Sequence, residues 1–141
     1  MKGHASFRVR SDFFDMDLQQ HLARQAAFSR ATFGPGQRTK GVIDHIKKEL
    51  KEVAIADNCL GKCKEWTDVS ILGFDGLLRA CRSYLEEVNP FEKIKITNSQ
   101  VADMAVRLLL EKQEINELRD WPDWRTMSED KAIEHDRSKE G

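Results

Sequence analysis

The sequence predicts an all-α fold, an antiparallel four-helix bundle with a short helical C-terminal tail, and three observations support this. Only three prolines and eight glycines interrupt the 141 residues, which favours long helices over a turn-rich β fold. Apolar residues recur at the spacing of one helical face in several long segments. The connections between these segments are short, so consecutive helices are expected to be antiparallel. The length fits a single domain over residues 1–141.

The first predicted helix spans Asp17–Thr32 and follows an irregular N-terminus, residues 1–15. Phe33-Gly34-Pro35-Gly36 ends this helix, because proline and two glycines do not continue a helix without cost. A loop is expected to continue to about Lys40, and it contains Arg38. The inner face of the helix is predicted to contain Leu18, Leu22, Ala26 and either Phe28 or Ser29.

The second and third predicted helices span Gly41–Asp57 and Lys62–Val88. Asp57-Asn58 and Gly61 separate them, and Pro90 ends the third because the residue before a proline avoids the helical conformation. The buried face of the second helix is expected to contain Val42, Ile43, Ile46, Leu50 and Val53.

A fourth helix is predicted from Thr97 to about Leu118, after a connection over residues 91–97. Thr97 and Gln100 have the spacing of a capping box. The helix is expected to bury Val101, Ala105, Leu108, Leu109 and Ile115. In the tail, residues 121–141, Thr126 and Glu129 have the same capping spacing and predict a short helix to His135.

The composition argues against several classes of protein. A net charge of −1 does not suit a non-specific binder of nucleic acid polymers, which usually has a basic surplus. No apolar run reaches the length of about 18–20 residues that a membrane span requires, and the N-terminus lacks the apolar core of a signal peptide. Three cysteines, an odd number without a second pair for a zinc site, indicate a cytoplasmic protein.

Two acidic pairs are the most informative residues. Glu49 and Glu52 are three positions apart on the second predicted helix, and Glu65 and Asp68 are three apart on the third, so each pair shares a helix face. Both pairs lie beside the apolar stripe of their helix. Carboxylates near a bundle interior repel one another and lose hydration unless cations neutralise them. Magnesium prefers oxygen ligands and often links carboxylates to phosphate oxygens.

Two alternatives explain the same acids. A solvated charged face is one, since a third of the residues are charged and such pairs arise easily by chance. A di-iron bundle is the other, but its Glu-x-x-His motifs are missing, because no histidine has a glutamate three positions earlier.

The spacing Glu49-x2-Glu52-x12-Glu65-x2-Asp68 resembles the signature of the all-α nucleoside triphosphate pyrophosphohydrolases, the MazG and dimeric dUTPase group. Further segments resemble the dATP/dGTP diphosphohydrolase branch of phages and bacteria, which includes the phage MazZ enzymes. Together they cover roughly residues 17–137, and they are Phe28–Gly36, Gly41–His45, Glu65–Val69, Trp121–Arg125 and Asp130–His135.

The resemblance implies cleavage between the α and β phosphates of dGTP or dATP, giving a deoxynucleoside monophosphate and pyrophosphate. It implies Mg²⁺, with Mn²⁺ able to substitute, bound by the two acidic pairs, with Asp75 as a ligand of an additional ion or a group that orients a ligand. Glu49 or Glu52 is expected to take the proton of the attacking water. In the MazZ branch, the dGMP product supplies synthesis of the modified base 2-aminoadenine.

Basic residues and one asparagine are the expected substrate ligands. Lys112, Asn116 and Arg119 share a face of the fourth helix, and related enzymes use a similar helix to bind phosphates. An exposed charged helix end is the alternative for these three. Arg38 and His45 are further candidates for phosphate contact; a plain turn is the alternative at Arg38, and a hydrogen bond to a carboxylate the alternative at His45.

The resemblance also implies a homo-oligomer, a dimer or a tetramer, in the cytoplasm, or in the cytoplasm of the bacterial host if a phage encodes the chain. Three other functions fit a helical chain of this kind: a non-catalytic nucleotide-binding or regulatory module, a general house-cleaning pyrophosphatase, and an interaction protein without a ligand.

Overall fold

The computed structural model describes residues 15–138, so residues 1–14, where most of the predicted irregular N-terminus falls, lie outside the description. Helix α1, Leu18–Phe33, begins at Asp17, whose side chain accepts a hydrogen bond from the Gln20 amide while the Gln20 side chain accepts one from the Asp17 amide. This capping box satisfies two amides that would otherwise lack partners. The helix ends where Gly34 adopts a φ of 90°, a conformation that favours glycine.

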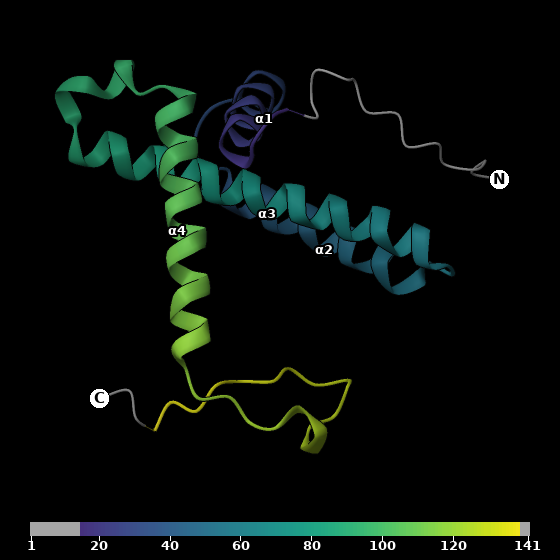
Figure 1. Cartoon of the computed structure of the whole chain (residues 1–141). Helices are drawn as coiled ribbons and strands as arrows, with labels where there is room; N and C mark the ends of the chain where they lie inside the picture. The colour runs from purple at the N-terminus through teal and green to yellow at the C-terminus, as the bar shows by residue number, and fades with distance from the viewer. Residues whose placement is uncertain (1–14, 139–141) are drawn as a thin grey trace. The chain divides into compact units, whose positions relative to one another are not determined.

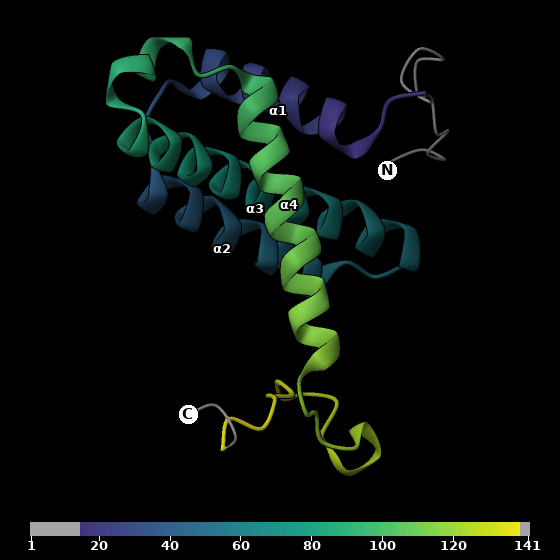
Figure 2. The same ribbon diagram turned by 60° about the vertical axis from the view of Figure 1, so that its left-hand side comes forward.

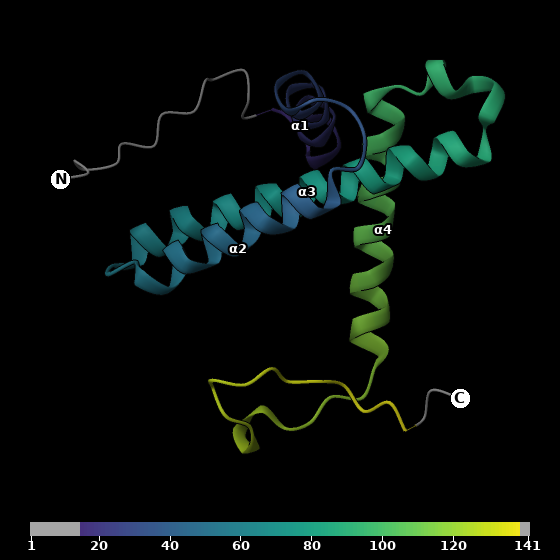
Figure 3. The same cartoon turned by 180° about the vertical axis from the view of Figure 1, so that it is seen from behind.

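Helices α2, Thr39–Ile55, and α3, Cys59–Val88, form an antiparallel hairpin (Figure 1). Asn58 begins α3 by accepting a hydrogen bond from the Gly61 amide at 2.7 Å. The view from behind shows the same close pairing of the two helices (Figure 3). The hairpin therefore places residues near the end of α2 beside residues near the start of α3.

Helix α3 is the central element of the first part of the chain, because α2, α1 and the 3-10 helix η2, Pro90–Lys95, all pack against it. Figure 2 shows α3 between α1 and α2. The helix α4, Asn98–Leu118, contributes its first turns to the same core. The buried apolar residues are Leu22, Ala26, Val42, Leu78, Cys81, Val101, Ala102 and Ala105.

The chain divides into two compact units, residues 1–106 and 107–141. The second unit contains the last turns of α4 and a tail with one short 3-10 helix, η3, Trp124–Thr126. The expectation of a single domain stays a prediction. None of the helices in residues 15–138 is long and apolar enough to cross a membrane.

The predicted all-α fold class is confirmed, since residues 15–138 form helices and contain no strand. The capping box of Thr97 and Gln100 is confirmed by two reciprocal hydrogen bonds of 2.8 and 3.1 Å. Helix α2 begins two residues before the predicted Gly41, after Arg38 in a left-handed conformation with φ of 49°. Helix α3 begins three residues before the predicted Lys62, because Asn58 caps it and Gly61 lies inside its first turn.

The tail helix differs in position from the prediction. Thr126 ends η3 instead of beginning a helix, and its hydroxyl donates to the Asp123 carbonyl. Asp123 is the residue that caps this short turn, by accepting from the Arg125 amide. Residues 127–138 contain turns and no helix, so the helix predicted from Thr126 to His135 is wrong.

Several predicted core positions are more exposed than expected. Ile43 and Leu50 of α2 are 46% and 42% exposed, although Val42 is buried. Leu18, Leu108 and Ile115 are also exposed, whereas Leu22, Ala26, Val101 and Ala105 are buried as predicted. Of the two alternatives for one inner position of α1, Ser29 is buried and Phe28 is exposed. Helical spacing identifies one face of a helix, but it does not say how much of that face a neighbouring element covers.

Candidate active site

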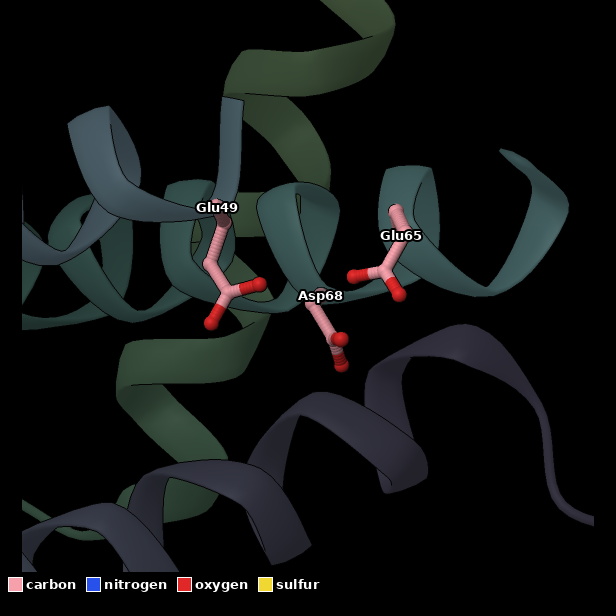
Figure 4. Close-up of side chains that lie close together, drawn as sticks. All are labelled: Glu49, Glu65 and Asp68. Carbon is pink, nitrogen blue, oxygen red and sulfur yellow. The ribbon is translucent and has the colours of Figure 1, made fainter. Parts of the chain in front are cut away.

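Three carboxylates converge on the α2–α3 hairpin. Glu49 of α2 and Glu65 and Asp68 of α3 each offer one oxygen, and these oxygens lie within 4.8 Å of one another. Figure 4 shows the three side chains turned toward a common space. Glu49 and Glu65 are partly buried and Asp68 is exposed. We call these three residues the acidic cluster.

The hairpin explains why these residues meet. Glu49 precedes Ile55, the last residue of α2, by six positions, and Glu65 follows Cys59, the first residue of α3, by six positions. At a rise of 1.5 Å per residue, both lie about 9 Å from the turn, so antiparallel pairing brings them level. Asp68 joins them because residues three apart share a helix face.

Glu52 and Asp75, the other two predicted metal ligands, lie outside the acidic cluster. Glu52 is one helical turn nearer the hairpin turn than Glu49, and it is exposed. Asp75 is buried and bonded to other groups. Their roles in metal binding or proton transfer stay predictions.

A buried polar network holds Asp75. Nε of Arg79 donates to both carboxylate oxygens of Asp75 at 3.1 Å, and the Ser29 hydroxyl donates to the same carboxylate. Nη1 of Arg79 also donates to the carbonyls of Gly34 and Gly36, each at 2.8 Å. The network therefore joins α1, α3 and the turn after α1, and it satisfies a buried ion pair that would otherwise be costly.

A pocket of about 400 Å³ opens beside the acidic cluster. Arg38, His45 and Lys48 line it on the α2 side, and Leu72, one helical turn after Asp68, lines it on α3. His45 connects it to the cluster, because its Nε2 lies 3.4 Å from Oε1 of Glu49. Basic groups next to carboxylates suit a ligand that has both phosphates and bound cations.

Arg38 and His45 were both expected to contact substrate, and the structure brings them to this one pocket. Lys48 was not predicted, although its spacing from His45 and Asp44 on α2 places it on the same side of the helix. The sequence did not predict that Ser29 and Arg79 bind Asp75 in one polar network, because this depends on contacts between distant segments.

Gln25 is another residue that the sequence did not single out. Its amide donates to the Ile71 carbonyl of α3 at 2.8 Å, so it lies next to the helix that bears Asp68. Its Oε1 atom is buried and has no hydrogen-bond partner among the described residues. A buried acceptor of this kind needs a donor from water or a ligand.

The acidic cluster fits a divalent cation. Its donors are carboxylate oxygens only, which Mg²⁺ prefers, and three ligands leave coordination positions for water and phosphate oxygens. Without a cation, three carboxylates at this distance repel one another. The chemistry of the donor set therefore fits a hard divalent cation such as Mg²⁺.

A comparison with protein families matches residues 21–139 to the model of the dATP/dGTP pyrophosphohydrolase family. The chain belongs to this family. The match covers most of the sequence, including the acidic cluster and nearly all of the second unit. Neither the curated proteins nor the solved structures yielded a match. The chain is thus an enzyme, a hydrolase that acts on nucleoside triphosphate anhydrides.

The phosphate-binding residues expected on α4 belong to the second unit of this pyrophosphohydrolase. Nη1 of Arg119 donates to the Asn116 side chain at 3.0 Å, and Nε1 of Trp121 donates to the Asn116 carbonyl at 2.6 Å. Lys112 is exposed one turn before Asn116. These contacts orient Asn116 and Arg119, and the substrate role of the three residues stays a prediction.

Proposed function

We propose that this pyrophosphohydrolase uses Mg²⁺ to hydrolyse dGTP or dATP between the α and β phosphates. Water is consumed, and the products are a deoxynucleoside monophosphate and pyrophosphate. The observation that supports the proposal most directly is the convergence of Glu49, Glu65 and Asp68 beside a pocket whose lining includes basic side chains. The family match supplies the class of substrate.

Glu49, Glu65 and Asp68 would hold the cation through one oxygen each. When bound, Mg²⁺ would neutralise phosphate charge and lower the pKa of a water molecule in its coordination shell. The side chains of the protein would supply proton transfer. Carboxylates that do not bind the cation with both oxygens can accept a proton, and Glu49 or Glu52 is the proposed acceptor.

The basic groups of the pocket position the substrate. Arg38 and Lys48 would bind phosphate oxygens, and His45 would hold Glu49 in place through its 3.4 Å contact or donate to a phosphate. Lys112, Asn116 and Arg119 are proposed to bind the leaving pyrophosphate. Positive charge at the leaving group stabilises the transition state of phosphoryl transfer.

A substrate panel tests the reaction. The purified chain is incubated with Mg²⁺ and dGTP, dATP or the corresponding ribonucleotides, and pyrophosphate, phosphate and monophosphate are quantified. We expect pyrophosphate and a monophosphate in equal amounts. Release of phosphate with formation of a diphosphate would show that the bond assignment is wrong.

Variants of the acidic cluster test the site. Glu49→Gln and Asp68→Asn should each lower kcat/KM by roughly 100-fold or more while the fold is retained, because each removes one charged ligand. Glu87→Gln is the matched control, since Glu87 is an exposed acid of the same helix outside the cluster. Glu52→Gln separates two versions of the proposal: a comparable loss indicates that Glu52 takes part, and near-normal turnover leaves Glu49 as the proton acceptor.

We also propose that the enzyme is a homo-oligomer, a dimer or a tetramer. Large apolar side chains of the first unit are exposed, including Ile55 at 73%, Phe28 at 61% and Trp66 at 52%. Large exposed apolar side chains often lie at protein–protein interfaces. Light scattering coupled to size exclusion should give a mass of two or four chains, and a species of 16.3 kDa at micromolar concentration would argue against it.

A cellular role follows if the enzyme resembles the MazZ branch. We propose that it acts in the cytoplasm, with a preference for dGTP, and that its dGMP supplies synthesis of 2-aminoadenine. Comparison of kcat/KM for dGTP and dATP tests the preference. Equal values for both substrates would favour a general role in control of the nucleotide pool.

A further inference from the structure

Asp75 and Arg79 also line a second cavity. It has a volume of about 280 Å³ and opens between α1, the Gly34–Gly36 turn, α3 and η2. A neighbouring cavity of about 410 Å³ has four charged residues in common with it. These are Arg30, Arg82, Glu86 and Lys93, which we call the basic junction.

The basic junction contains three cations and one carboxylate. Nη1 of Arg82 donates to the Ile96 carbonyl at 2.9 Å, and its Nη2 donates to the Asn98 side chain, so this guanidinium is held in place. Within residues 15–138, the side chains of Arg30 and Lys93 have neither a hydrogen bond nor an ion pair. Two cations therefore face a cavity without a partner that neutralises them.

Electrostatics at Arg82 agree with this geometry. Burial lowers the pKa of the Arg82 guanidinium, the nearby positive charge of Arg30 lowers it further, and Glu86 acts in the opposite direction. Repulsion between two guanidinium groups costs free energy that a bound anion would remove. One carboxylate is too little to balance three cations.

The basic junction is remote from the acidic cluster. Arg82 follows Asp68 by four turns of the continuous helix α3, which is about 21 Å at 1.5 Å per residue. A cation bound at the acidic cluster would therefore not contact a ligand at the junction directly. Asp75 lines both this cavity and the pocket beside the cluster, whereas Arg79 lines this cavity and not that pocket.

We propose that the basic junction is a second ligand site that binds a phosphate-bearing anion. Arginine and lysine are the residues that bind phosphate through charge-assisted hydrogen bonds. The hydroxyl of Ser83 lines the same cavity and offers a neutral donor. Free phosphate, pyrophosphate and the phosphate of a nucleoside monophosphate share this chemistry. Pyrophosphate and the monophosphate are the products of the proposed reaction, and phosphate forms when pyrophosphate is hydrolysed.

Calorimetric titration tests the site in the full chain. Phosphate, pyrophosphate and dGMP are each titrated in the presence of a chelator at constant low ionic strength, so that metal-dependent binding at the acidic cluster is excluded. Arg30→Gln and Lys93→Gln should each weaken binding by roughly tenfold. Lys95→Gln is the matched control, because Lys95 is an exposed lysine of η2 that lines neither cavity, and it should leave affinity unchanged.

Glu86→Gln provides a change of opposite sign. Removing the carboxylate should tighten binding of every anion, because it removes repulsion of the ligand. Tighter binding of dGMP than of free phosphate would support the site with a nucleotide as its ligand, and the reverse order would support it with the free anion. Absence of binding by all three probes, or equal effects of Lys93→Gln and Lys95→Gln, would overturn the proposal.

The test is independent of the proposed reaction. In Asp68→Asn, turnover should fall while the affinity for phosphate in chelator stays at the value of the unmodified chain. A loss of phosphate affinity in Asp68→Asn as large as in Lys93→Gln would overturn the second site, since the anion would then depend on the acidic cluster. A failure of turnover in the unmodified chain would instead count against the proposed function alone.

Discussion

Replacement of Asp75 by alanine should destabilise the chain more than any other single change in its charged residues. The Asp75 side chain is 9% exposed, and the side chain of its partner Arg79 is 7% exposed. Removal of the carboxylate leaves the positive charge of Arg79 buried without its counterion. The Ser29 hydroxyl loses its acceptor in the same step.

The magnitude follows from what remains around Arg79. Loss of one partner of a buried ion pair usually costs about 3–5 kcal/mol. Arg79 would keep its hydrogen bonds to the carbonyls of Gly34 and Gly36, which partly compensate the charge. We therefore expect the lower end, about 3 kcal/mol, out of a total stability of about 5–15 kcal/mol for a domain of this size. The corresponding fall in Tm is roughly 10 °C.

Urea denaturation followed by circular dichroism at 222 nm measures this change, with the chelator present. Asp75→Asn should cost less, because the amide oxygen still accepts from Ser29. Asp44→Ala is the control, since Asp44 pairs with Lys48 at 3.3 Å on the exposed face of α2 and such pairs contribute at most about 0.5 kcal/mol. The comparison stays informative if Asp75→Ala does not fold, because Asp75→Asn should still lower the free energy of unfolding more than Asp44→Ala does.

The result also separates two roles for Asp75. If Asp75 stabilises the fold through Arg79, the loss appears without any metal. If Asp75 is chiefly a metal ligand, the metal-free chains should be equally stable, and the variant should only require more Mg²⁺ for turnover. A difference below about 1 kcal/mol between Asp75→Ala and the unmodified chain in chelator would refute the structural argument.

Three further predictions concern glycines, thiols and metal. Gly36→Ala should destabilise the fold by about 1 kcal/mol, because Gly36 has a φ of 89°. Gly73→Ala should stabilise the fold by about 0.5–1 kcal/mol, because Gly73 lies inside α3 with open space around it. Thermal melts of both variants check these two effects. Burial raises the pKa of the Cys81 thiol, whereas Cys59 and Cys63 are exposed. At pH 8 a thiol reagent should therefore modify Cys59 and Cys63 rapidly and Cys81 only after unfolding. Mass spectrometry of timed samples measures the order of modification. Removal of divalent cations by a chelator should abolish pyrophosphate release, and excess Mg²⁺ should restore it; full activity in chelator would exclude a metal-dependent reaction.

The helices were predictable to within a few residues, because the signals that begin and end them are local. The Thr97–Gln100 capping box formed as predicted, and the proline at position 90 marks the end of α3. The tail was less predictable. Thr126 has capping spacing in the sequence, but it ends a short turn, since no apolar stripe follows that would hold a helix against the fold.

The candidate site divides in the same way. Glu65 and Asp68 were identifiable as neighbours because three residues separate them on one helix. Whether Glu49 or Glu52 faces them depends on how α2 is aligned with α3, which the length and conformation of the hairpin turn determine. Only Glu49 joins the group among the described residues.

The amino-acid sequence by itself determined the helical class, the Thr97–Gln100 capping box, the two acidic pairs and the family, since each depends on residues close together in the chain or on their order along it. The tertiary structure decided which three carboxylates converge, that Asp75 is paired with Arg79, and that Arg30, Arg82 and Lys93 surround one cavity. These features depend on contacts between different helices and on what surrounds each side chain. Helical periodicity could not predict them, because it describes only the face of one helix. The packing of the helices against one another therefore determines the electrostatic environment of each charged group.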